Sequence, residues 1–236
     1  MKFADPLVRA TLLKRYKRFL ADVQFEDGSI ATVHVANPGS MIGLKEPGMA
    51  VWLSPARNPA RKLRWSWELA DVDGGLVGVS TAHPNRIAEE AILAGAIPEL
   101  ADFRSLRREV KYGRNSRIDI LLEDPAKGVA YVEIKNVNLM REPGLAEFPD
   151  AATARGAKHL EELGDMVEAG HAAWMLYVVQ RMDCGQFAVA TDIDPAYAAA
   201  LERARTRGVG VLCYMCDITL EEIRLSGPVG LRSGTD

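Results

Sequence analysis

The chain has 236 residues, of which 48% are hydrophobic and 26% are charged, and its formal net charge is −3 at pH 7. This length allows one or two domains with a large buried core. No apolar run approaches the roughly 18 residues of a membrane-spanning helix. The mild acidity argues against a protein that coats nucleic acid with its whole surface. The first residues mix charged and apolar types too closely for a signal peptide, so we expect a cytoplasmic protein with no membrane partner.

The three cysteines are too few for a disulfide framework, which agrees with a reducing compartment. Cys213 and Cys216 have CxxC spacing, but they lie in GVGVLCYMCDI, an apolar run that we interpret as a buried strand. Side chains three positions apart on a strand point to opposite faces, so we do not expect these two thiols to share a metal.

Positive charge is concentrated at the start of the chain. Residues 1–82 contain 11 basic and 8 acidic side chains, whereas the remainder has a net charge of −6. Basic side chains in such a segment are candidates for contacts with nucleic-acid phosphates. The candidates here are Lys14, Arg15, Lys17, Arg18, Lys62 and Arg64.

The segment from about residue 17 to residue 80 contains short β-like runs broken by turn signals such as EDGS and NPGS. Five or so short strands without a helix predict a small closed β-barrel, for which an OB-like barrel is the best match, although other small barrels fit the same pattern. Trp65 and Trp67 share a strand face, and we expect at least one of them in the core. Aromatic residues interleaved with basic ones are also typical of barrels that bind single strands.

The pattern changes after residue 82, where helical and strand-like segments begin to alternate. We therefore predict an OB-fold-like barrel over residues 1–82 and an α/β domain over residues 83–236. The predicted helices cover about residues 85–97, 151–168 and 195–207, and the predicted strands cover 108–113, 116–123, 128–139, 171–180, 185–191 and 208–218.

Two helices of this second domain carry specific expectations. In the first, Ile87, Ala91 and Ala94 have the spacing of core positions. The second is expected to begin after Asp150, because Asp is a favoured N-cap residue. The stretch before it, residues 140–150, is expected to be irregular.

Charged residues stand in the middle of two predicted strands. In YVEIK, residues 131–135, the two-residue period of a strand places Glu133 and Lys135 on the same face. In RIDIL, residues 117–121, Asp119 is surrounded by apolar neighbours. The connection between the two strands is short, so we expect them to be neighbours, with Asp119 close to Glu133.

Two carboxylates about 4 Å apart repel each other by roughly 4 kcal/mol at an effective dielectric constant of 20. A divalent cation would offset this repulsion, and oxygen ligands suit Mg²⁺ or Mn²⁺. Lys135 could then hold an attacking water or stabilise charge on a scissile phosphate. An ordinary alternative stays open, in which Glu133 and Lys135 pair on a solvated strand face and Asp119 pairs with Arg117.

Polar helices flank these strands, and the whole order resembles the PD-(D/E)XK nuclease superfamily. The resemblance implies that Asp119 and Glu133 bind the metal and that Lys135 assists the attacking water. It also implies an additional metal ligand from the first helix, either Glu89 or Glu90, which as helix neighbours cannot both point inward.

The chain departs from the superfamily pattern at two places. Ile118 stands before Asp119 where the pattern often has proline, and TARGAKHLEEL, residues 153–163, replaces a Gln-x-x-x-Tyr helix motif. Of the four scattered histidines, only His159 is predicted near the site. The phosphate-side candidates from this domain are Arg117, Arg155 and Lys158.

Six segments in order are similar to the sugar fermentation stimulation protein A family of bacteria and archaea. They are RYKRFLADV, TVHVANPGSMIGL, PNRIAEEAI, REVKYGRNSRIDILLE, YVEIKNVNL and FPDAATARGAKHLEEL. This resemblance implies an OB-fold domain, a PD-(D/E)XK domain and DNA binding. It also implies a role in transcription regulation of sugar, especially maltose, utilisation genes, for which the residues themselves give no direct evidence.

Two functional hypotheses follow. In the first, the protein is a Mg²⁺- or Mn²⁺-dependent nuclease, and the barrel grips the DNA that the second domain cuts. In the second, the same fold binds DNA without cutting it. The sequence contains no HExxH, P-loop or GxGxxG motif and no recognisable helix-turn-helix. Single- or double-stranded DNA, and assembly into a homo-oligomer, are left open.

Overall fold

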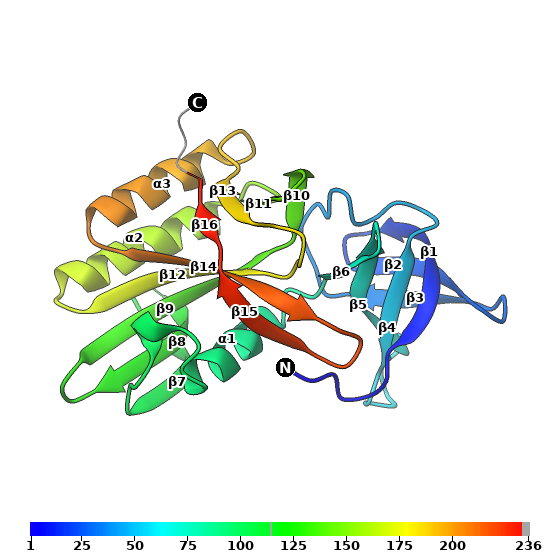
Figure 1. Ribbon diagram of the computed structural model, residues 1–236, viewed down its shortest axis with the longest axis horizontal. Helices are drawn as coiled ribbons and strands as arrows, with labels where there is room; N and C mark the ends of the chain where they lie inside the picture. Colours follow the sequence, from blue (N-terminus) through cyan, green and yellow to red (C-terminus); the bar gives the residue numbers. More distant parts are fainter. Residues whose placement is uncertain (114, 233–236) are drawn as a thin grey trace.

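The computed structural model describes residues 1–113 and 115–232, which form two domains that lie side by side (Figure 1). The first is a barrel in which five strands follow the order β3-β2-β1-β4-β5, and pairing between β3 and β5 closes it. A sixth strand, β6, pairs antiparallel with β5. The bounds are β1 (Val8–Tyr16), β2 (Leu20–Phe25), β3 (Ile30–Val35), β4 (Ala50–Pro55), β5 (Trp65–Val72) and β6 (Gly75–Gly78).

This closed five-stranded barrel confirms the predicted OB-like class. Strand β1 lies before the segment of about residue 17 onward in which strands were predicted; its basic residues mask its alternation. Trp67 is fully buried and donates from its indole nitrogen to the carbonyl oxygen of Leu69 at 2.8 Å, as expected for a core aromatic. Trp65 is partly exposed and packs against Phe25.

The second domain is built on a mixed six-stranded sheet of order β15-β14-β12-β9-β8-β7. Helix α1 (Pro84–Leu93) covers one face, while α2 (Ala154–Glu168) and α3 (Pro195–Thr206) cover the other (Figure 1). A short 3₁₀ helix, η1 (Pro98–Leu100), follows α1. The strands are β7 (Ser105–Tyr112), β8 (Ser116–Asp124), β9 (Gly128–Val137), β12 (Ala172–Val179), β14 (Gly210–Ile218) and β15 (Ile223–Pro228).

The two faces of this sheet bury two separate apolar clusters, and β14 contributes to both. Cys213 packs in the cluster under α2 and α3, and Cys216 packs in the cluster under α1. The two thiols therefore point to opposite faces, as predicted. On α1 the prediction that Ala94 is a core residue is wrong, because the helix ends at Leu93; Ala94 is exposed and Ile92 is buried instead.

The segment expected to be irregular contains a hairpin. Strands β10 (Leu139–Glu142) and β11 (Leu145–Phe148) pair antiparallel, and β11 continues a small sheet with β13 (Gln186–Val189) and β16 (Gly230–Leu231). The strands of this hairpin are only four residues long, too short for a clear alternation, and β15 and β16 were not predicted either.

Asp150 is not the N-cap of α2, contrary to the sequence-based prediction. The helix begins at Ala154, with Thr153 at the N-cap position. The Asp150 side chain instead accepts a hydrogen bond from the Met41 backbone N–H at 3.2 Å. The backbone carbonyl oxygen of Asp150 accepts another from the Ser40 hydroxyl at 2.7 Å. Asp150 therefore binds donors of a barrel loop, and not the backbone N–H groups at the start of α2.

The two domains meet along β6. The Gly78 N–H donates to the Gln180 carbonyl at 2.9 Å, and the Gln180 side-chain amide donates to the Ser80 carbonyl at 3.0 Å. Leu69 of the barrel is buried in the apolar cluster under α1, with Trp52 packed against the same cluster. The barrel and the sheet domain therefore share part of one core.

We predict that Gly78→Ala destabilises the protein by about 1–3 kcal/mol, the usual cost of overpacking a buried site. A Cβ atom at Gly78 would lie 2.4 Å from Gln180 Oε1 and 2.9 Å from its Cβ. Gln180 is fully buried and hydrogen-bonded, so it has no room to retreat. Urea denaturation followed by circular dichroism measures the effect.

The matched control is Gly227→Ala, since a Cβ at Gly227 meets nothing within 4 Å. Equal stability of the two variants would show that the junction is looser than described.

Candidate active site

Strands β8 and β9 separate next to Asp119. Their pairing matches Ile120–Asp124 with Gly128–Val132. Beyond it, Asp119 Oδ2 accepts a hydrogen bond from the Ile134 backbone N–H at 2.8 Å. The Asp119 carboxylate therefore fills the opening between the two strands and comes close to Glu133.

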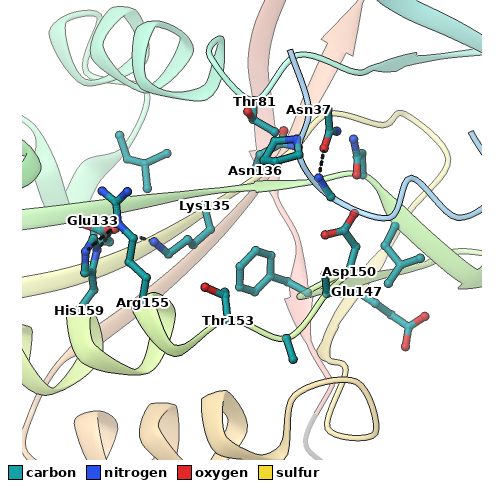
Figure 2. Close-up of a pocket in the computed structure, with 18 of the residues that line it drawn as sticks. Asn37, Thr81, Glu133, Lys135, Asn136, Glu147, Asp150, Thr153, Arg155 and His159 are labelled. Carbon is teal, nitrogen blue, oxygen red and sulfur yellow. Dashed lines mark hydrogen bonds and ion pairs between the residues drawn. The ribbon is translucent and has the colours of Figure 1, made fainter. Parts of the chain in front are cut away.

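A cavity of about 600 Å³ lies at this opening, and both domains line it. Asp119, Glu133 and Lys135 contribute from the sheet; the strand period predicted the shared face of Glu133 and Lys135, and the short connection predicted the approach of Asp119. Figure 2 shows Lys135 directed toward Glu133, with Arg155 and His159 of α2 beside them. The barrel side contributes Arg18, Asn37, Pro38, Gly39 and Thr81.

Glu133 is 2% exposed, and its two carboxylate oxygens differ in their hydrogen bonding. Oε1 accepts hydrogen bonds from Lys135 Nζ at 2.6 Å and from His159 Nδ1. Oε2 is buried and has no hydrogen-bond partner. Burial tends to raise the pKa of Glu133, but the hydrogen bond from His159 and the charge of Lys135 outweigh it, so the pKa is lowered. Glu133 is thus an ionised carboxylate with one unused acceptor.

Asp119 is held by two donors, the Asn85 side-chain amide and the Ile134 backbone N–H, each at 2.8 Å. Its pKa is nevertheless raised, first by burial and then by the negative charge of Glu133. The pair therefore repels in the way that the sequence analysis anticipated.

These residues fit a divalent cation. Glu133 Oε2 is buried and has no hydrogen-bond partner, and the charge of Glu133 repels that of Asp119. A cation between the two carboxylates would bind that oxygen and offset the repulsion. Mg²⁺ commonly binds one or two protein carboxylates and keeps several waters. Within residues 1–113 and 115–232 no cluster of three or more His, Cys, Asp or Glu side chains suited to a metal is found, so water or substrate oxygens would complete the coordination.

The acidic residues predicted on the first helix do not reach the cavity. Glu89 forms an ion pair with Arg108 at 3.2 Å, and Glu90 pairs with Arg86 at 2.9 Å and with the amino group of Met1. The residue of α1 that does line the cavity is Asn85, one turn earlier. The structure does not bring Glu89 or Glu90 to the cavity, because α1 presents its first turn, and not its middle, to the site.

His159 lies closer to the chemistry than the sequence analysis claimed. It is 4% exposed, and its Nε2 accepts a hydrogen bond from Arg155 Nε at 3.3 Å. That bond leaves Nδ1 as the proton donor of the ring toward Glu133. Arg155 and His159 together restrain the orientation of the Glu133 carboxylate.

Arg15 has a structural role that the sequence did not reveal. Its Nη2 donates to the carbonyl oxygens of Arg18 at 2.8 Å, Asn37 at 2.8 Å and Gly39 at 3.0 Å. Burial lowers its pKa, and the charge of Asp150 partly compensates. Arg15 is therefore committed to the barrel loops and is a poor candidate for a phosphate contact.

The remaining basic candidates divide by position. Arg18 and Arg155 line the cavity. Lys14 pairs with Asp22 at 3.3 Å and Lys158 pairs with Glu162 at 3.6 Å. Those on the surface away from the cavity lining are Lys14, Lys17, Lys62, Arg64, Arg117 and Lys158.

Sequence reasoning missed the amide side chains of the site. Asn37 is 2% exposed, donates to the Val79 carbonyl and accepts from the Gly39 N–H at 2.8 Å. The NPGS motif that contains it could be interpreted as a phosphate-touching loop or as a tight turn, and the turn was preferred. Asn85 stands close to the predicted domain boundary, and its hydrogen bond to Asp119 depends on packing that no local pattern encodes.

We predict that Mg²⁺ or Mn²⁺ raises the unfolding temperature of the wild-type protein and that Asp119→Asn removes most of this increase. A ligand at one hundred times its Kd stabilises a folded protein by about 2.7 kcal/mol. The side-chain amide of the variant can still form hydrogen bonds with Ile134 and with Asn85 if the Asn85 amide rotates. Because one repulsive charge is removed as well, we expect the metal-free variant to be at least as stable as the wild-type protein. Thermal denaturation at pH 7 with the cation or with EDTA measures both effects.

Asp217→Asn is the control, since its exposed carboxylate on β14 pairs with Arg224. A cation response that survives in Asp119→Asn would place the binding site elsewhere.

Comparisons with known proteins cover almost the whole chain. The family model described as SfsA N-terminal OB domain matches residues 13–79, and the model described as Sugar fermentation stimulation protein RE domain matches residues 82–222. The "Sugar fermentation stimulation protein homolog" of Rhodospirillum centenum is 61% identical over 223 residues, which cover 94% of this chain and 96% of that protein. The homologue of the same name from Paramagnetospirillum magneticum is 59% identical over 229 residues, covering 97% of each.

A solved structure agrees with the fold of both domains. The structure of Pyrococcus furiosus SfsA in complex with Ca²⁺ is 26% identical in sequence and superposes with a TM-score of 0.89. The match covers 99% of this chain and 98% of that one. Barrel and sheet domain therefore share their arrangement with that protein.

Proposed function

The chain belongs to the sugar fermentation stimulation protein family, and we propose that it is a DNA-binding protein whose second domain cleaves phosphodiester bonds with a divalent cation. One observation carries the proposal. Glu133 is a buried, ionised carboxylate with an oxygen that lacks any donor, beside Asp119 and Lys135 in a cavity that both domains line.

Asp119 and Glu133 would hold the cation. When bound, the cation would polarise the phosphate and lower the pKa of a bound water. The Ca²⁺ complex of the Pyrococcus furiosus relative supports divalent cation binding in this family. We propose Mg²⁺ or Mn²⁺ here, because the donors are carboxylate oxygens.

Lys135 brings positive charge to the reacting phosphate. Its ammonium lies 2.6 Å from Glu133 Oε1, so it can donate to the attacking water or to a phosphate oxygen as negative charge develops. In the reaction a water oxygen bonds to phosphorus, one P–O ester bond breaks, and the leaving oxygen takes up a proton. The products are a phosphomonoester and a hydroxyl group.

A second candidate is a DNA-binding regulator of sugar, including maltose, utilisation genes that does not cut DNA. The observation that favours it is the lack of an acidic side chain from α1 in the cavity, where Asn85 stands instead. Two carboxylates would then bind a cation weakly or only structurally.

Cleavage assays separate the two candidates. We predict that the wild-type protein cuts labelled DNA in Mg²⁺ or Mn²⁺ but not in EDTA. Lys135→Ala and Glu133→Ala should lower the rate by roughly 100-fold or more, as expected for loss of a group that acts in the transition state. Single-stranded and double-stranded substrates are compared in parallel, with products resolved on denaturing gels.

Lys127→Ala is the matched control, because Lys127 is an exposed lysine next to the turn between β8 and β9, where it donates to the Ala101 carbonyl. Tight binding without cleavage in every metal would reject the nuclease and leave the second candidate.

We also predict that DNA binding weakens steeply with salt. Each phosphate contact releases a counterion, so a few contacts lower the affinity roughly ten-fold or more between 50 and 200 mM salt. Fluorescence anisotropy in EDTA measures binding without cleavage. An affinity that stays constant over this range would count against the basic side chains as the contact surface.

A further inference from the structure

The turn between β1 and β2 carries two basic side chains and one exposed aromatic side chain, none of which is needed to form a turn. Residues Lys17, Arg18 and Phe19 form this turn, which we call the guide hairpin. Arg18 lines the cavity with the candidate catalytic residues, and Phe19 is 46% exposed. Arg18 thus lies at the cavity, and the exposed Lys17 and Phe19 are its neighbours in the same turn.

The backbone of the guide hairpin is unfavourable for these residues. Lys17 has φ 48° and Arg18 has φ 60°, in the left-handed region where Gly, Asn and Asp are preferred. Asn and Gly adopt such backbone angles more readily than Lys or Arg. Backbone strain of this kind concentrates at functional sites, where the side chains matter more than the local stability.

Arg15 fixes the guide hairpin relative to the cavity. The same Nη2 atom donates to the Arg18 carbonyl in the hairpin and to the Asn37 and Gly39 carbonyls in the neighbouring loop. That loop is docked on Asp150 of the second domain, and a Cβ at Gly39 would lie 2.2 Å from Asp150 Oδ2. The hairpin is therefore held beside the site and is not a free surface turn.

A second arginine lines the cavity from the other domain. Arg155 of α2 stands beside Glu133 and His159, as Figure 2 shows. Arg18 and Arg155 thus provide positive charge from two domains around the carboxylates. Guanidinium groups bind phosphate through several donors, so these two are suited to successive phosphates of one strand.

The size of the cavity favours one strand over two. Cavities of 300–1,000 Å³ hold ligands the size of a small molecule, and this one, at about 600 Å³, fits one or two nucleotide units. Enzymes that act inside such a pocket take an unpaired strand or extrude a nucleotide from the duplex. Basic side chains combined with an exposed aromatic ring are the usual means of binding single strands.

We propose that the guide hairpin leads an unpaired DNA strand into the site and makes single-stranded DNA the preferred substrate. Arg18 and Arg155 bind phosphates on the strand, and Phe19 stacks on a base before the strand enters the cavity. This inference rests on the proposed function, because it names the substrate class of the same site.

The first test exchanges the turn for one that suits its backbone. Lys17→Asn combined with Arg18→Gly relieves the left-handed strain, so the variant should unfold at the same denaturant concentration as wild type or a higher one. Its affinity for a fluorescent oligothymidine of about 15 nucleotides should fall roughly ten-fold, measured by anisotropy in EDTA. The charge-matched control, Arg9→Ala with Arg57→Ala, removes two positive charges elsewhere on the barrel and should change the affinity much less.

The second test concerns the aromatic ring. Phe19→Ala should weaken binding of the oligothymidine roughly ten-fold and leave binding of a blunt duplex almost unchanged, because only unpaired bases can stack on the ring. Ile30→Ala is the control, since Ile30 is an exposed apolar residue on the same barrel, 63% accessible.

The outcomes separate this inference from the proposed function. If wild type binds neither single-stranded nor duplex DNA, the proposed function fails. If wild type cleaves a blunt duplex as fast as a single strand, or if the Asn-Gly hairpin variant binds the oligothymidine like wild type, the guide hairpin is wrong and the nuclease proposal stands.

Discussion

Two negative charges held in one partly dehydrated cavity govern the organisation of this molecule. Asp119 and Glu133 come from strands that separate at this point; both oxygens of Asp119 accept hydrogen bonds, whereas only one oxygen of Glu133 does. The pKa of Asp119 is raised by burial and by its neighbour, while that of Glu133 is lowered by His159 and Lys135 despite burial. The surrounding residues therefore stabilise one charge well and the other poorly. Such an arrangement is useful where a positively charged ligand completes it, and it explains why α2 brings a histidine and an arginine to the same place.

The barrel contributes to this centre through its loops. The loop around Gly39 is docked on Asp150, and Arg15 ties that loop to the guide hairpin. The barrel thus provides part of the wall of the cavity, and its basic charge is directed at the site. A separate binding domain tethered by a linker would not place Arg18 at a fixed position beside the carboxylates.

The parts that could be predicted from the sequence are those with a local period. Alternation on a strand put Glu133 and Lys135 on one face, and the short connection put Asp119 near them. Short strands between turn signals gave the barrel, and the opposite faces of Cys213 and Cys216 followed from the same geometry.

The parts that failed depend on partners far away in sequence. Asp150 has the chemistry of an N-cap, but its donor is the Met41 N–H, 109 residues distant. Arg15 has the chemistry of a phosphate contact, but its Nη2 donates to carbonyl oxygens of two loops. On α1 a shift of one turn decides whether a glutamate or Asn85 reaches the site, and only tertiary packing sets that register.

The shared core at the domain junction limits how this architecture could have been assembled or altered. Leu69 of the barrel is buried among side chains of the sheet domain, and Trp52 packs against the same cluster. The barrel has an apolar cluster of its own, but it also completes the cluster under α1, so it is not a module joined to the second domain only by a flexible tether. Replacing the barrel by another one would therefore have to preserve the apolar contacts of Leu69 and Trp52 with the sheet domain, whereas a change confined to the loops would leave them intact.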